Sequence, residues 1–335
     1  MINLKDKILG SIYGVIIGDA LGVPVEFHSK AYLKNNPISE MTGYGTYNQP
    51  PGTWSDDSSM TLCLIDMLNG EYNLHILADN FVKWRFDSQF TPFNHAFDVG
   101  NTTRSALSRY KRNKDPFKSG EKSVTSNGNG SLMRILPLLF YIKDFSEIKR
   151  IEIIRDVSSI THAHIRSVLA CYFYLEFALK ILNGVDKVAA FNITRSEYIN
   201  KIESNNSEFI NAFFKEESEN NYDILVKEFN HFPYIQNGYQ FPIKFDNLVS
   251  DGYVVNTLDT AFSCILSENT FESTVLKSIN NGEDTDTSGA VTGGLAGIIY
   301  GYSNIPSNWV DGLQNVELLE KYISLFTNKY SKQNL

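Results

Sequence analysis

Glycines recur every four residues in two apolar stretches of the chain. They are Gly10, Gly14, Gly18 and Gly22 in the first stretch, and Gly289, Gly293, Gly297 and Gly301 in the second. Residues four apart lie on one face of an α-helix, so each stretch would present a face without side chains that another helix can approach closely. A glycine inside a helix costs about 1 kcal/mol relative to alanine. We therefore expect two helices that cross tightly, because close packing can offset that cost.

The same spacing also occurs in membrane-spanning helices. Asp19 interrupts the first run, and Asp284 and Asp286 precede the second. Neither run therefore offers the roughly 20 apolar residues that a spanning helix needs. Two lysines followed by residues 8–18 also resemble a secretory signal, but the glycine face favours a buried helix. We expect no contact with a membrane.

The composition indicates a soluble globular protein. The 335 residues carry a formal charge of −8 and contain no long runs of lysine or arginine. Both features argue against a protein that binds the phosphate backbone of a nucleic acid. Length would permit two domains, but no linker or repeat is visible, so we expect one domain over residues 1–335. Cys63, Cys171 and Cys264 are widely spaced among apolar residues. We interpret them as reduced core thiols of a cytoplasmic protein.

Apolar residues recur mainly at helical spacing. Between residues 153 and 179 they follow one another at intervals of three and four, over a stretch too long for a strand. A series of alternating strands is not visible. Only segment 238–243, Gly-Tyr-Gln-Phe-Pro-Ile, has the extended character of a strand. The pattern predicts a mainly helical fold.

Oxygen-bearing side chains gather at residues 281–290, directly before the second glycine run. Asp284, Asp286 and Thr287 fall within four residues, at a turn that opens an apolar helix. Mg²⁺, Mn²⁺ and Ca²⁺ prefer such ligands. An EF-hand loop is excluded, because Leu295 occupies the twelfth position, where a bidentate glutamate is needed. A metal site and an acidic helix cap remain as interpretations.

A second cluster, Ser55-Asp56-Asp57, has the same arrangement, since it also precedes an apolar helical run. Alone, it is best explained as an N-cap followed by acids that the helix dipole favours. Two such helix starts could instead present their oxygens to one point. A cation between them would remove the repulsion between the adjacent aspartates.

Together with four further blocks, these motifs resemble the ADP-ribosylglycohydrolase family, which includes the dinitrogenase reductase-activating glycohydrolases. The matching blocks, in order, are residues 10–27, 52–62, 98–107, 128–138, 161–170 and 252–309. Residues 190–251 match poorly and form a divergent insert. The resemblance implies an all-α fold, a compact orthogonal multi-helix bundle with a two-metal centre.

By this resemblance, six residues hold two divalent cations, Mg²⁺ or Mn²⁺: Ser55, Asp56, Asp57, Asp284, Asp286 and Thr287. The sequence departs from the usual pattern at three positions. Ser55 replaces a threonine, Glu283 replaces a glycine before Asp284, and Ile165 replaces a proline after His164. The charge of Glu283 could alter metal affinity or crowd the leaving group.

The resemblance also implies catalytic roles. Glu26 matches a family glutamate that lies over the metals, and we expect it to gate the site or to act as an acid or base. The alternative interpretation of Glu26 is an acid at the protein surface. Asp98 is a candidate proton donor, and capping of a helix near Thr102 is the alternative. Asp57 and Asp284 complete the residues expected to take part in catalysis.

An acidic protein has to hold the diphosphate of ADP-ribose mainly with backbone amides. The expected binding residues are Gly100, Asn101, Thr102, Ser126, Asn127, Gly128, Asn129, Gly130, Ser131 and His162. Without the resemblance, both glycine-asparagine segments would be ordinary turns. His162 and His164 lack the partners of a zinc site, and His164 is best explained as a hydrogen-bonded residue at a helix start.

The function implied is metal-dependent hydrolysis of the glycosidic bond between ADP-ribose and an acceptor, most simply a protein side chain, with arginine as the first choice. A small ADP-ribosylated molecule is a second possible substrate. Two alternatives remain open: a catalytically silent ADP-ribose-binding or structural relative, and an immunity protein that neutralises an ADP-ribosylating toxin. In the second case, the insert at 190–251 could contact the toxin.

Overall fold

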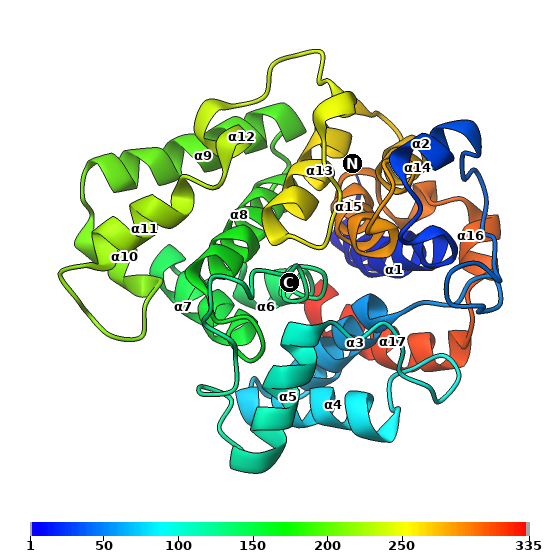
Figure 1. Cartoon of the computed structure of the whole chain (residues 1–335), viewed down its shortest axis with the longest axis horizontal. Coiled ribbons are helices and arrows are strands. Elements are labelled where there is room, and N and C mark those ends of the chain that lie inside the picture. The colour runs from blue at the N-terminus through cyan, green and yellow to red at the C-terminus, as the bar shows by residue number, and fades with distance from the viewer. Residues whose placement is uncertain (1, 333–335) are drawn as a thin grey trace.

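The computed structural model describes residues 2–332, which form α-helices joined by loops (Figure 1). The first helices are α1 (Leu4–Gly22), α2 (Lys30–Asn35), α3 (Asp56–Asn69), α4 (Leu74–Asp87), α5 (Asn101–Asn113), α6 (Leu138–Ile142), α7 (Glu147–Ser158) and α8 (Ile165–Leu182). They are followed by α9 (Lys187–Glu203), α10 (Ser207–Ala212), α11 (Asn221–Phe229), α12 (Pro233–Asn237), α13 (Val254–Ser267), α14 (Phe271–Ile279), α15 (Thr285–Tyr300), α16 (Ser307–Asp311) and α17 (Val316–Ser331). Short 3₁₀ turns occur at η1 (Val23–Val25), η2 (Phe245–Asn247) and η3 (Tyr302–Asn304).

The expected all-α fold is confirmed, since residues 2–332 contain only two isolated β-bridges and no strand. The strand considered for residues 238–243 was wrong. That segment is a loop between α12 and η2, and no strand lies beside it to pair with. Pro242 also lacks the N–H that a ladder would require.

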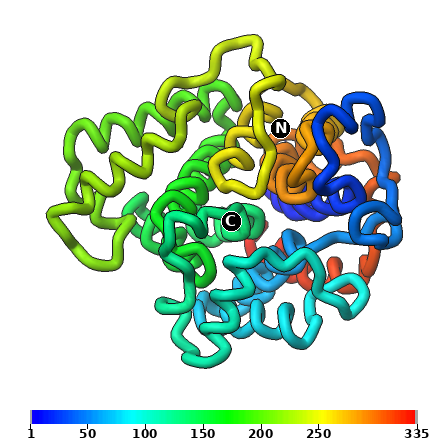
Figure 2. The backbone as a smooth tube through the Cα atoms, in the orientation of Figure 1, coloured from blue at the N-terminus to red at the C-terminus, as the bar shows by residue number. Residues whose placement is uncertain are grey.

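Helices α1 and α15 pack against each other along their glycines, as expected. They come from opposite ends of the chain and lie side by side, blue against orange, in Figure 2. Gly10 faces Gly297, and Gly14 faces Gly293, so closely that a Cβ at any of these four positions would overlap the facing backbone. Gly301 differs from the expectation. It ends α15 with a φ of 80°, a conformation that favours glycine.

Helix α1 forms part of the core. By length and composition alone, Leu4–Val25 could cross a membrane, so the expectation that this run is too short was wrong. Asp19 does not interrupt the helix, because backbone and hydroxyl donors bind its carboxylate. The protein buries 94% of the most apolar part of this helix against its own core. The three cysteines are likewise buried and free.

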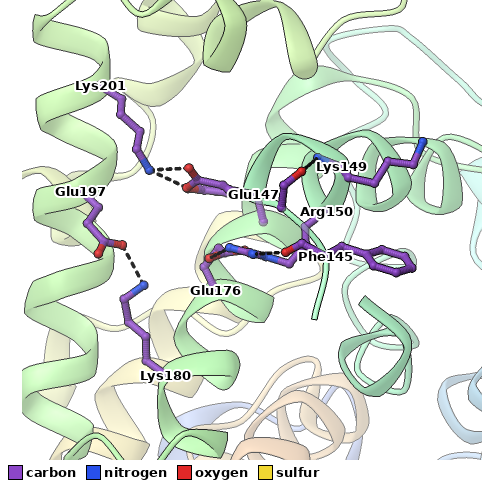
Figure 3. A network of polar contacts seen from close by, with 10 residues as sticks. Phe145, Glu147, Lys149, Arg150, Glu176, Lys180, Glu197 and Lys201 are labelled. Carbon is purple, nitrogen blue, oxygen red and sulfur yellow. Dashed lines mark hydrogen bonds and ion pairs between the residues drawn. The ribbon is translucent and has the colours of Figure 1, made fainter. Parts of the chain in front are cut away.

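Helices α9 to α12, which contain most of the insert, form an arm on one side of the molecule (Figure 1). Packed aromatic rings join the arm to α8. For example, the ring centroids of Phe173 on α8 and Tyr198 on α9 are 4.9 Å apart. Ion pairs between α7, α8 and α9 reinforce this junction (Figure 3). The Nε of Arg150 lies 2.6 Å from the Glu176 carboxylate, and both side chains are largely buried.

Candidate metal centre and substrate cleft

One cleft, with a volume of about 320 Å³, brings together most of the residues that the sequence analysis selected. The predicted residues that line it are Glu26, Asp56, Asp98, Gly100, Asn101, Thr102, Gly128, Asn129, Gly130, His162, Asp284 and Thr287. Ser55, Asp57 and Asp286 are buried and do not line it. Sequence reasoning did not select five other lining residues: Phe27, Val99, Thr103, Met133 and Gly252.

The start of α3 is held in place by a carboxylate of α1. Ser55 caps this helix, and its hydroxyl accepts a hydrogen bond from the backbone N–H of Asp57. The carboxylate of Asp19 accepts hydrogen bonds from the backbone N–H groups of Ser55 and Ser58, each at 3.0 Å or less. Asp19 therefore fixes the helix start that carries Asp56 and Asp57. In the sequence, Asp19 is recognisable only as an acid within an apolar helix with regularly spaced glycines.

The start of α15 is fixed by hydrogen bonds to three other segments of the chain. The backbone N–H of Asp284 donates to the carbonyl of Ser250 at 2.8 Å, and Asn129 donates its amide to the Asp284 carboxylate at 2.8 Å. The hydroxyl of Thr285 donates to the carbonyl of Gly22 at 2.8 Å. Helix α15 thus begins directly against the end of α1, with Asp284 and Asp286 facing the start of α3.

Two overlapping groups of carboxylates result. Oxygens of Asp19, Asp57 and Asp286 lie within 4.8 Å of one another, and so do oxygens of Glu26, Asp284 and Asp286. One buried oxygen each of Glu26, Asp57 and Asp286 has no hydrogen-bond partner in the protein. A buried carboxylate oxygen without a donor is unfavourable unless a cation or a proton satisfies it. The donor set therefore fits hard divalent cations.

Burial dominates the electrostatics of this centre. It raises the pKa values of Asp56, Asp57 and Asp286 well above their usual range, and repulsion from neighbouring carboxylates raises them further. Burial, followed by repulsion from Asp98, raises the pKa of Glu26 to about 9. These shifts refer to the protein without cations. A bound cation would favour the charged carboxylates and lower the pKa values again.

Asp98 does not cap the helix that follows it. Helix α5 begins at Asn101, and its N-cap is Gly100, which offers no side chain. Asp98 has a φ of 53°, and its carboxylate accepts a hydrogen bond from the hydroxyl of Tyr47 at 2.5 Å. The carboxyl group of Asp98 lines the cleft, and burial raises its pKa to about 6. The capping alternative is therefore wrong.

The comparisons with known proteins agree with this geometry. The model of the ADP-ribosylglycohydrolase family matches residues 1–334. The chain belongs to the ADP-ribosylglycohydrolase family. The family resemblance and the predicted class of enzyme, a hydrolase, are confirmed.

Two relatives and a solved structure illustrate how far the similarity to other family members extends. The ADP-ribosylarginine hydrolase Tri1 of Serratia proteamaculans is 29% identical over 316 residues, which cover 93% of this chain and 76% of the relative. The ADP-ribosyl-[dinitrogen reductase] glycohydrolase of Rhodospirillum rubrum is 27% identical, with coverages of 93% and 91%. A structure described as an ADP-ribosylglycohydrolase-related protein complex superposes with a TM-score of 0.73 at 26% identity, covering 98% of each chain.

The structure places two of the departures from the usual ADP-ribosylglycohydrolase pattern, Glu283 and Ile165. Glu283 adopts a φ of 62°, which explains why a glycine suits this position, and its side chain is exposed. His164 caps α8 by accepting a hydrogen bond from the backbone N–H of Arg166 at 3.3 Å. The interpretation of His164 as a helix-start residue is confirmed. Ile165 then forms the first turn of α8.

His162 enters the cleft as a neutral side chain. It is buried, and burial lowers its pKa to about 3, with a further contribution from Arg134. Its Nδ1 lies 2.8 Å from the hydroxyl of Thr161. Its ring packs so closely on Gly130 that a Cβ there would lie 2.8 Å from the His162 Cε1. An ADP-ribosylglycohydrolase ligand would meet an uncharged imidazole here.

Only part of the segment 126–131 lies at the cleft. Gly128, Asn129 and Gly130 line the cleft, whereas Ser126, Asn127 and Ser131 do not. Asn127 instead donates to the carbonyl of Val124 at 2.9 Å, within a turn. The segment continues in further turns until α6 begins at Leu138.

Proposed function

We propose that this protein hydrolyses the glycosidic bond between ADP-ribose and a modified protein side chain, with arginine as the preferred acceptor, and uses two Mg²⁺ or Mn²⁺ ions. The observation that carries the proposal is the buried carboxylate centre, whose unpartnered oxygens lie beside the cleft. The names of the relatives support a protein acceptor, since one is an ADP-ribosylarginine hydrolase. The other acts on an ADP-ribosylated reductase.

Six residues would hold the ions: Ser55, Asp56, Asp57, Asp284, Asp286 and Thr287. They offer only hydroxyl and carboxylate oxygens, as hard cations require. When bound, the cations would supply electrostatic stabilisation of the charge that develops as the bond breaks.

The protein's own acids would handle protons. Glu26 lines the cleft and is the first candidate to donate a proton to the leaving group. Asp98 lies on the same cleft and is a second candidate donor. Glycoside hydrolysis requires such a donor for a poor leaving group.

The diphosphate would bind to backbone amides. Within residues 2–332, no lysine or arginine lines the cleft. Helix α5 has thirteen residues, and its N-cap, Gly100, makes no side-chain cap, so the first amides of the helix are free to bind an anion. The neutral His162 could add a hydrogen bond. This arrangement supports the proposed roles of Gly100, Asn101 and Thr102.

Matched peptides test the proposal. The purified protein is incubated with ADP-ribosyl-arginine or ADP-ribosyl-serine peptides, in Mg²⁺, Mn²⁺ or a chelator, and released ADP-ribose is measured. We expect metal-dependent release from the arginine peptide and at least a 100-fold loss in Asp286→Asn, a magnitude typical of removed transition-state stabilisation. Glu40→Gln, which changes an exposed acid, is the control. Release in the chelator, or full activity of Asp286→Asn, contradicts the metal assignment, and release from serine alone contradicts the acceptor.

A further inference from the structure

The segment from Gly45 to Tyr47 packs directly along the backbone that carries Glu26. A Cβ at Gly45 would overlap the carbonyl of Pro24, so only glycine permits this approach. The backbone N–H of Thr46 donates to the Pro24 carbonyl at 3.0 Å, and its hydroxyl donates to the Glu26 carbonyl at 2.6 Å. Two hydrogen bonds and one close approach thus hold the main chain at Pro24 and Glu26.

The side chain of Tyr47 continues this contact toward the carboxyl groups. Its hydroxyl donates to the Asp98 carboxylate at 2.5 Å and lies beside the carboxyl group of Glu26. Its ring packs between two aromatic side chains, 5.1 Å from Phe97 and 6.4 Å from Phe27, measured between centroids. Burial, followed by the charge of Asp98, raises the pKa of Tyr47 above its usual value. The phenol therefore stays protonated and acts as a donor.

The two carboxyl groups lie outside the regular elements of the fold. Asp98 lies in a loop with a φ of 53°, and Glu26 is followed by Phe27 with a φ of 65°, so no helix or strand fixes either group. Asp98 also repels Glu26. The O–H of Tyr47 donates to Asp98 and its oxygen lies beside Glu26, so one hydroxyl contacts both groups and restricts their rotamers. Tyr47 itself does not line the cleft, so any effect on the reaction has to pass through the groups that do.

We propose that Tyr47 is a positioning residue that orients the carboxyl groups of Glu26 and Asp98 for the reaction. This inference rests on the proposed function, because the two acids are its candidate proton donors. Productive geometry tolerates only small displacements of such groups, which gives the hydroxyl of Tyr47 its importance. The expected consequence is an effect on kcat rather than on substrate binding.

A double-mutant cycle tests this role. Tyr47→Phe removes the hydroxyl and keeps the ring, and we expect kcat to fall roughly 10- to 100-fold with KM nearly unchanged, as for loss of one charge-assisted hydrogen bond. In the Asp98→Asn background, the same change should lower kcat by less than about 3-fold, because coupled residues are not additive. Tyr44→Phe is the matched control, since Tyr44 is 68% exposed.

An unchanged kcat in Tyr47→Phe, or an equal loss in both backgrounds, overturns the positioning role. A crystal structure of Tyr47→Phe gives a second readout that does not depend on activity. We expect the Asp98 carboxylate to leave the position that it occupies here, and unchanged positions of both carboxyl groups also overturn the role. If the wild-type protein releases no ADP-ribose from either peptide, the proposed function fails, and the structural readout still decides what Tyr47 does.

Discussion

Individual carboxylates define the chemistry of this molecule. Asp57 and Asp286 are buried, repel each other and leave oxygens without partners, a combination that a folded chain tolerates only when something else stabilises the site. The acidic motifs of the sequence had already singled out both residues. Asp19 and Tyr47 were missed, because a lone acid in an apolar helix and a lone tyrosine in a loop do not indicate which side chains they will meet.

The raised pKa of Glu26 predicts how stability varies with pH in the cation-free protein. Its pKa rises from 4.5 to about 9 on folding, so the folded state binds more protons across this range, and stability falls as pH rises through it. In Glu26→Gln, this fall should be shallower. Thermal midpoints measured from pH 5 to about 9 in a chelator check the difference between the two proteins. Saturating Mg²⁺ should flatten the wild-type curve. Equal slopes for wild type and variant contradict the prediction.

At the scale of elements, the glycine faces of α1 and α15 decide where the two acidic helix starts can meet. The glycine spacing predicted this crossing, because a helix face without side chains allows a second helix to approach closely. The loops beside the cleft were harder to predict. Phe27, Asp98 and Glu283 all adopt positive φ values that neighbouring segments impose, and local sequence gives little indication of such conformations in residues other than glycine.

Gly14→Ala tests the helix crossing. A Cβ at this position would overlap the carbonyl of Gly293, where only a backbone shift could relieve the clash. We expect the free energy of unfolding to fall by about 3 kcal/mol despite the better helix propensity of alanine. Chemical denaturation measures the loss. Gly70→Ala is the control, because the nearest atom to its Cβ would lie 3.6 Å away, and it should change stability by less than about 1 kcal/mol. Equal effects would contradict tight packing.

At the scale of the whole molecule, the proposed cations would join distant parts of the chain. Their ligands come from the starts of α3 and α15, which lie more than 200 residues apart in sequence. The arm of α9 to α12 supplies none of the residues that line the cleft. Binding free energy should therefore stabilise the helix starts much more than the arm.

Hydrogen exchange can test this distribution. On addition of Mg²⁺, we expect amides in the first turns of α3 and α15 to exchange more slowly, while amides of α11 (Asn221–Phe229) on the arm keep their rates. A chelator should reverse the change, and Asp286→Asn should abolish it. Uniform slowing across the molecule, or slowing in the arm alone, would contradict a cation bound between the two helix starts.

The sequence alone determined the helical class, the crossing of α1 and α15, and the acidic residues at two helix starts. These features depend on spacing along one helix, and spacing is visible in a sequence. The tertiary structure decided the rest: that Asp19 supports the start of α3, that Asn129 binds Asp284, and that Tyr47 links the loops of Glu26 and Asp98. Such contacts join residues from separate loops, and their partners depend on how the whole chain packs.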